Sequence, residues 1–205
     1  KVFGIEMVYV PAGSFVLGDG SGSAESMNAF HVASNTAVGI TLAAVSSITV
    51  DTNGADDIDS TPIAVDGDGG ITGNANWPAG YNAFYLMKYE MTEGLWTDFF
   101  NTLTPAQKIT RDITGAAGKN SDAAVDRNTI SWAAGDATST RSDRAAGYLS
   151  WMDGCAFADW AALRPMTELE FEKAARGSGT AAVYQECAWG STSLTAAETL
   201  SGSEN

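Results

Sequence analysis

Three residue types are scarce in this chain, and each shortage excludes a class of function. One histidine, His31, and two cysteines, Cys155 and Cys187, cannot build a Cys/His zinc cluster, and no Cys-x-x-Cys pair is present. Only 11 Lys and Arg residues oppose 25 Asp and Glu, so the formal net charge is -14. Such a chain lacks the basic surface that displaces counterions from nucleic-acid phosphates, and anionic membrane surfaces would repel it. Its apolar runs are also too short for a transmembrane helix. We therefore expect no nucleic-acid partner and no membrane insertion.

The remaining composition predicts a folded chain with the character of an extracellular protein. Hydrophobic residues make up 44% of the 205 residues and aromatic residues 10%, which is enough apolar surface to offset the entropy of ordering. Lysine is scarce, Gly, Ser, Thr, Asn and Asp are frequent, and the pI is near 4.2. Secreted bacterial proteins share this composition, so we expect a location outside the cell or on its surface.

The N-terminal half predicts strands separated by loops. Residues 2–17 are rich in Val, Phe and Tyr and are broken at Pro11-Ala12-Gly13, which predicts a strand, a turn and a second strand. Residues 36–50 are rich in β-branched side chains and predict one or two strands. Residues 51–80 are rich in Asp, Gly and Asn and predict a long loop, and residues 81–92 predict another strand-like stretch.

The C-terminal half predicts short helices, each with a start signal. These signals are Thr92, Thr104-Pro105, Ser150 and Thr167. The last forms a capping box with Glu170, and Gly177 is placed to end that helix through a left-handed cap. Apolar residues recur at helical spacing after Thr92, which strengthens the prediction of the first helix.

Four segments, taken in order, resemble one family. They are MVYVPAGSFVLGD (7–19), FYLMKYEMTEGLWTDFFN (84–101), YLSWMDGCAFADWAALRPMTELEFEKAARG (148–177) and AWGS (188–191). Together they resemble the formylglycine-generating, or sulfatase-modifying factor, domain, and the third segment is the most specific. The resemblance implies an α+β fold of the irregular C-type-lectin-like kind, with short helices, small antiparallel sheets and long loops.

On this resemblance we expect a single domain over 1–205 that is C-terminally incomplete, with loop insertions at about 18–80 and 109–147. The family's later Gly-Asn-Val-Trp-Glu-Trp-like, Arg-Gly-Gly-Ser-Trp and Gly-Phe-Arg stretches do not occur in the sequence. In the oxidase members, the cysteine pair that holds copper and attacks the substrate cysteine lies in that part. We therefore expect no catalytic and no cofactor-binding residue here. Within 109–147, Ile130 and Trp132 are the expected anchors of a surface excursion.

The third and fourth segments are interpreted as structural. Large apolar side chains are expected to build a core from little regular structure, namely Trp151, Phe157, Trp160 and Phe171. The other residues of this structural motif are Arg164, Thr167, Glu170 and Trp189. Arg164 lies between two predicted helices, where a guanidinium can satisfy loop carbonyls or pair with Glu168, Glu170 or Glu172.

Cys155 and Cys187 leave three interpretations open. They can be unpaired thiols, a mutual disulfide in an oxidising compartment, or a redox or copper site. Neither matches the family's active cysteines, so catalysis is the least favoured interpretation and unpaired thiols are the most favoured.

The best candidate for a metal site is an Asp-rich stretch. Its oxygen ligands are Asp51, Asn53, Asp56, Asp57, Asp66 and Asp68. Calcium takes several such ligands from a loop that can wrap around it, and no Lys or Arg lies between positions 2 and 87 to neutralise these carboxylates. However, Asp-Gly and Asn-Gly pairs are also ordinary turn signals, and no full EF-hand loop is present. Solvated turns are therefore the favoured interpretation, and calcium is the alternative.

Three weaker signals carry no chemistry by themselves. His31 has no nucleophile in a recognisable motif, so we expect an ordinary loop histidine. Ser14 and Ser150 lack a Gly-x-Ser-x-Gly setting. The glycines at 18, 20 and 22 lack the Gly-Lys-Ser/Thr ending of a phosphate loop.

Three functions remain, and we favour the first. The chain is expected to be a non-catalytic secreted or cell-surface module for adhesion or ligand binding, since loops on a rigid scaffold are where binding evolves. Its partners would then be a protein or glycan at the cell surface. The second function is the N-terminal part of a formylglycine-generating or related metal-dependent oxidase. The third is a subunit of a filament or surface layer, whose partners are copies of itself.

Overall fold

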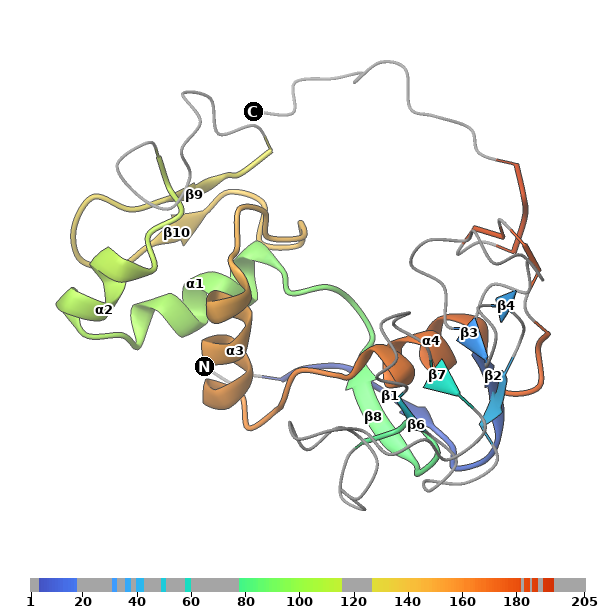
Figure 1. The fold of residues 1–205 in the computed structure, drawn as a ribbon. Helices are drawn as coiled ribbons and strands as arrows, with labels where there is room; N and C mark the ends of the chain where they lie inside the picture. The colour runs from blue at the N-terminus through green and yellow to red at the C-terminus, as the bar shows by residue number, and fades with distance from the viewer. Residues whose placement is uncertain are drawn as a thin grey trace. The chain divides into compact units, whose positions relative to one another are not determined.

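The computed structural model describes residues 4–17, 78–115, 127–181, 183–184, 186–187 and 190–193, and the backbone of short strands between 31 and 59. The chain divides into two compact units. The first unit contains residues 1–6, 87–165 and 197–205, and the second contains residues 7–86 and 166–196. Short helices and small sheets make up both (Figure 1), which confirms the mixed α+β class. Among the described residues, no helix has the length and apolarity needed to cross a bilayer.

The second unit is built from paired short strands and one helix. Strand β1 (Met7–Val10) pairs with β8 (Phe84–Met87), and β2 (Phe15–Leu17) pairs antiparallel with β5 (Ile40–Leu42), with Phe15 opposite Leu42. Two further antiparallel pairs are β3 (His31–Val32) with β4 (Thr36–Ala37), and β6 (Thr49–Val50) with β7 (Ile58–Asp59). Helix α4 (Glu168–Arg176) contacts β2. The predicted strand, turn and strand in 2–17 are confirmed.

The first unit holds the other helices and a small hairpin. Its elements are α1 (Glu93–Asn101), α2 (Pro105–Thr110), β9 (Ile130–Ser131), β10 (Thr138–Ser139) and α3 (Trp151–Trp160). Each helix begins where the sequence predicts it, because a hydroxyl of the N-cap residue accepts a hydrogen bond from a backbone N–H three residues later. Thr104 and Ser150 form reciprocal capping boxes with Gln107 and Asp153.

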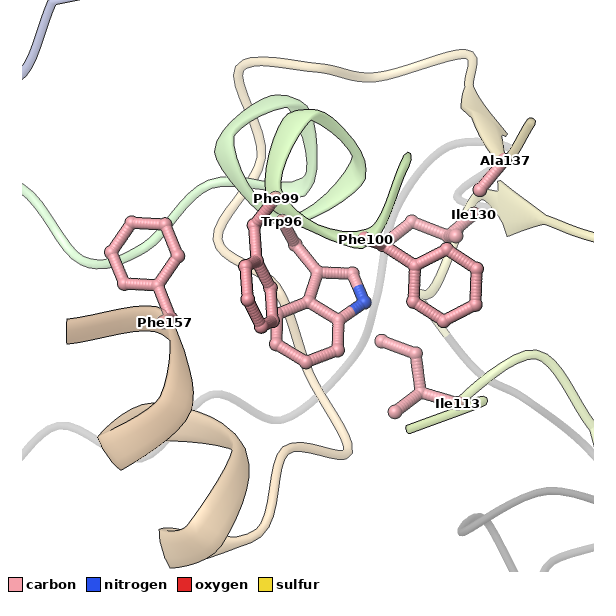
Figure 2. Packing of buried hydrophobic residues seen from close by; sticks show 7 residues of the cluster. All are labelled: Trp96, Phe99, Phe100, Ile113, Ile130, Ala137 and Phe157. Carbon is pink, nitrogen blue, oxygen red and sulfur yellow. The ribbon is translucent and has the colours of Figure 1, made fainter. Parts of the chain in front are cut away.

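An aromatic cluster forms the core of the first unit. Trp96, Phe99 and Phe100 project from α1 and meet Phe157 from α3, with Ile113, Ile130 and Ala137 around them (Figure 2). The rings of Phe99 and Phe157 meet edge to face, with centroids 6.0 Å apart and planes at 88°. Such tilted contacts are favourable for aromatic rings, so a few large side chains hold two helices and a hairpin together.

The segment 109–147 contributes more to this core than its polar composition predicts. Trp132 packs against Phe100 with ring centroids 5.2 Å apart, and Ile130 is buried, as expected for the two anchors. Ile113 and Ala137 are buried as well. The Asn101 side chain accepts a hydrogen bond from the Ala137 N–H at 2.7 Å and donates to the Ala137 carbonyl at 3.0 Å, which fixes the hairpin to the end of α1.

Two of the four predicted core anchors are exposed. The Trp151 side chain is 71% exposed and Phe171 is 58% exposed, whereas Phe157 is buried and Trp160 is partly buried. Helix phase explains the difference. The buried residues of α3 are Asp153, Phe157 and Ala158, and those of α4 are Leu169, Glu170 and Lys173. Trp151 and Phe171 therefore fall on the solvent sides of their helices, and the prediction that they are core anchors is wrong.

Candidate functional site

The candidate calcium ligands lie outside the described residues. Asp51, Asn53, Asp56, Asp57, Asp66 and Asp68 all fall there. Within the part of the chain that the structure describes, no three His, Cys, Asp or Glu side chains gather in a way that could hold a metal ion. The calcium site remains a prediction.

The two cysteines belong to different units. Cys155 lies on α3 in the first unit and Cys187 lies in a loop of the second, and both are partly buried free thiols. The Cys187 N–H donates to the Ser191 carbonyl at 2.8 Å, and the Gly190 N–H donates to the Cys187 carbonyl at 2.9 Å. Gly190 has a φ of 77°, which an L side chain rarely adopts. A tight turn thus places Cys187, and the disulfide remains a prediction.

Cys187 and Arg176 line a cleft of about 210 Å³ in the second unit, together with Glu172 and Glu186. The Arg176 guanidinium donates to a Glu172 carboxylate oxygen at 2.6 Å and to the Val16 carbonyl at 3.3 Å. The first contact lies within α4, and the second ties α4 to strand β2. The thiol therefore borders a cleft in which one cation and one anion already face each other.

Among the described charged residues of the second unit, Lys173 is the most deeply buried, and no motif in the sequence marks it as functional. Its side chain is only 1% exposed. The ammonium donates to the carbonyls of Pro11 and Gly80, each at 2.7 Å, with the Gly13 carbonyl at 3.3 Å and the Tyr81 carbonyl at 3.5 Å. Burial lowers the pKa of Lys173 below its ordinary value. The signal in the sequence is its spacing, since it falls four residues after the buried Leu169 on the same face of α4.

The start of α4 is fixed by a second set of hydrogen bonds. The Thr167 hydroxyl accepts from the Glu170 N–H at 3.2 Å and donates to the Pro78 carbonyl at 2.7 Å. Glu170, which is buried, accepts from the Thr167 N–H at 3.0 Å. The predicted capping box is confirmed. The helix ends at Arg176 as expected, but Gly177 has φ 89° and ψ 167°, which is not the left-handed helical conformation that we predict.

Two buried carboxylates hold elements of the first unit together. Glu93, fully buried at the first position of α1, accepts from the Thr129 N–H at 3.0 Å, from the Thr129 hydroxyl, and from the Ser139 hydroxyl at 2.7 Å. Asp153, also fully buried, accepts from the Arg111 guanidinium at 2.9 Å and from the Ser150 N–H at 2.9 Å. These carboxylates connect α1 to β10 and to the residue before β9, and α3 to the C-cap residue of α2. The signal for Glu93 is its place three residues before Trp96 on the apolar face of α1.

The family assignment follows from a comparison of the whole sequence. The family described as "Sulfatase-modifying factor enzyme 1-like domain" matches residues 4–202. The chain belongs to this family. No curated protein and no solved structure matches the chain.

The segments that resemble the sulfatase-modifying factor family supply most of the contacts described above. The first segment contributes the Pro11 and Gly13 carbonyls and Phe15, the second contributes α1, and the third contributes α3 and α4. Of the remaining motif residues, Arg164 donates to the Pro165 carbonyl at 3.1 Å, in line with a loop-bonding role. Trp189 lies outside the described residues. In this member of the family, the matched segments build the scaffold.

The three weaker signals acquire no chemistry from the structure. Ser150 is a helix cap, whose hydroxyl donates to Asp153 at 2.8 Å. Ser14 lies in the loop before β2. His31 starts β3, where only the backbone is described, and the glycines at 18, 20 and 22 lie outside the described residues.

Proposed function

We propose that this chain is a non-catalytic module of a secreted or cell-surface protein, and that it serves adhesion, ligand binding or extracellular assembly. The proposal rests on the hydrogen bonds of the buried charged side chains, which hold elements of the fold together. Glu93, Asp153, Glu170 and Lys173 bond to backbone groups, to capping or hairpin hydroxyls, or to Arg111. A general acid or base must reach the proton of a substrate. Side chains that are enclosed and turned to their own backbone serve a scaffold instead.

The surrounding composition supports the same function. A net charge of -14 and a surplus of Asp, Gly, Ser and Thr suit a location outside the cell. We propose that the finer fold is the irregular C-type-lectin-like one, in which long loops provide the binding surface. The partner would be a protein or glycan at the cell surface or a further copy of the chain, and calcium held by the Asp-rich stretch is the candidate cofactor.

The family match favours one other candidate function. Oxidase members of the family convert a substrate cysteine to formylglycine with a copper-binding cysteine pair. The chain would then be the N-terminal part of such an oxidase. Cys155 and Cys187 are not at the positions of that pair, so the resemblance assigns them no catalytic role.

One experiment separates the two candidates. The protein is purified from its natural source, at the length at which the cell makes it, and is incubated with copper and a cysteine-containing substrate peptide, which is then analysed by mass spectrometry for formylglycine. In parallel, the fluorescently labelled chain is titrated onto intact bacterial cells. We expect saturable binding to cells and no formylglycine. Formylglycine formed by the natural protein would establish the oxidase instead, and an absence of saturable binding would contradict adhesion.

A further inference from the structure

The outer side of the β1–β8 pair carries two exposed tyrosines in contact. Tyr9 is 55% exposed and Tyr85 is 65% exposed, and their ring centroids lie 5.1 Å apart with planes at 51°. Successive side chains of a strand point to opposite faces. Phe84, next to Tyr85, lies with its ring 5.9 Å from the Lys173 ammonium and so faces α4. The tyrosine pair therefore occupies the face turned away from the helix.

This pair has the chemistry of a stacking surface for a small flat ligand. A tyrosine ring offers an apolar face and a hydroxyl at its rim. A pyranose sugar has a matching face of C–H groups and a rim of hydroxyls that can bond to the tyrosine hydroxyls. Because the two rings touch, they present two adjoining faces of the size that consecutive sugar residues occupy.

Charge and area argue against two other occupants of this surface, a nucleic acid and a large protein interface. Nucleic-acid bases also stack on aromatic rings, but no Lys or Arg lies between positions 2 and 87 and the chain carries a net charge of -14, so a phosphate backbone would be repelled. A stable protein interface needs on the order of 1,000 Å². Two tyrosines supply a fraction of that, since each side chain buries about 150–250 Å² when completely covered. A neutral saccharide satisfies both conditions.

We propose that Tyr9 and Tyr85 form a stacking site for neutral pyranose residues of a polysaccharide. The inference rests on the proposed binding function and names the ligand class for it. Stacking on one aromatic ring contributes about as much as the 1–3 kcal/mol measured for a base on an aromatic side chain. Loss of one ring is therefore expected to weaken binding about tenfold.

Affinity electrophoresis of the full chain tests this site. Native gels contain a neutral β-glucan, a neutral mannan or the anionic polygalacturonate. We expect at least one neutral polysaccharide to retard the chain and polygalacturonate not to do so. Tyr9→Ala and Tyr85→Ala should each lower the association constant about tenfold, and Tyr9→Phe should retain most of it because the ring face remains.

Two controls make the outcome decisive. Tyr85→Leu keeps an apolar side chain but removes the flat ring, so it should lose binding while its thermal midpoint stays at the wild-type value. Tyr89→Ala removes a tyrosine that is 58% exposed but lies against Lys88 rather than in the pair, and it should bind normally. Retardation by neither neutral polysaccharide, or equal retardation of the Tyr9→Ala and Tyr85→Ala variants, would overturn the site. Binding to cells that survives in both variants would overturn this site alone and leave the adhesion proposal intact.

Discussion

Replacement of Lys173 by methionine is the sharpest test of the scaffold. Methionine has nearly the length and volume of the lysine stem, so it fills the same space, but it cannot donate hydrogen bonds. The Pro11 and Gly80 carbonyls would lose a donor at 2.7 Å each. A buried acceptor without a partner costs about 1–3 kcal/mol, and removal of a buried charge returns part of that cost. We therefore expect Lys173→Met to lower the free energy of unfolding by about 2–4 kcal/mol.

The assay is urea denaturation at pH 7, followed by far-ultraviolet circular dichroism, because Lys173 lies in the second unit and the four described tryptophans lie in the first. Lys88→Met serves as the matched control, because Lys88 is exposed and pairs with Glu6 at the surface. We expect the control to leave the denaturation midpoint unchanged. A Lys173→Met variant as stable as the wild type would refute the reasoning, since the desolvation of the ammonium would then cancel everything its hydrogen bonds contribute.

The pH dependence of this difference has a definite sign. Burial lowers the pKa of Lys173, so between that lowered value and the unfolded value of about 10.4 the unfolded chain binds more protons than the folded chain. Below the folded pKa the desolvation cost is present in full. The stability of the wild type relative to Lys173→Met should therefore rise as the pH increases through this window. A difference that falls over the same window would show that the ammonium is favoured by the fold.

Three further predictions test other contacts. Gly80→Ala should destabilise the chain by about 1–3 kcal/mol more than Gly179→Ala. Both glycines have a positive φ near 80°, but of the two only Gly80 would place a Cβ 3.0 Å from Phe15 and 3.1 Å from the Leu169 carbonyl. Equal losses of stability in thermal denaturation would contradict this. Phe157→Ala should lower the free energy of unfolding in urea by about 3–5 kcal/mol, whereas Trp151→Ala should lower it far less because Trp151 is exposed. A larger loss for Trp151→Ala would show that Trp151 is a core residue. Glu93→Ala should cost about 2–3 kcal/mol, because the Thr129 and Ser139 donors lose their acceptor, and hydrogen exchange of the β9–β10 hairpin should speed up more than that of α3.

Local signals predicted the helix starts well. Thr92, Thr104, Ser150 and Thr167 each cap a helix in the structure. A capping interaction joins residues only three positions apart, so its partners are visible in any short stretch of sequence. The strand, turn and strand around Pro11 follow from equally local preferences for β-branched residues and turn formers.

Burial on the helices was harder to predict, because it depends on partners far away in the chain. Trp151 looks like a core residue from its size, and Lys173 looks like a surface residue from its charge. Which face of α4 is covered depends on carbonyls more than 90 residues earlier, around Pro11 and Gly80. The spacing within α4 places Lys173 on the same face as Leu169, but it does not show what covers that face.

The sequence by itself determined the family, the α+β class, the positions where helices begin and the strongly acidic surface, because each depends on residue identity or on neighbours within a few positions. Only the tertiary structure decided that a lysine ammonium sits among backbone carbonyls, that Glu93 holds a hairpin to α1, and that Tyr9 and Tyr85 meet on one face. Those outcomes depend on contacts between residues that lie 36 to 162 positions apart in the chain. The free energy of burying a polar side chain depends on the hydrogen-bond partners that the fold places around it.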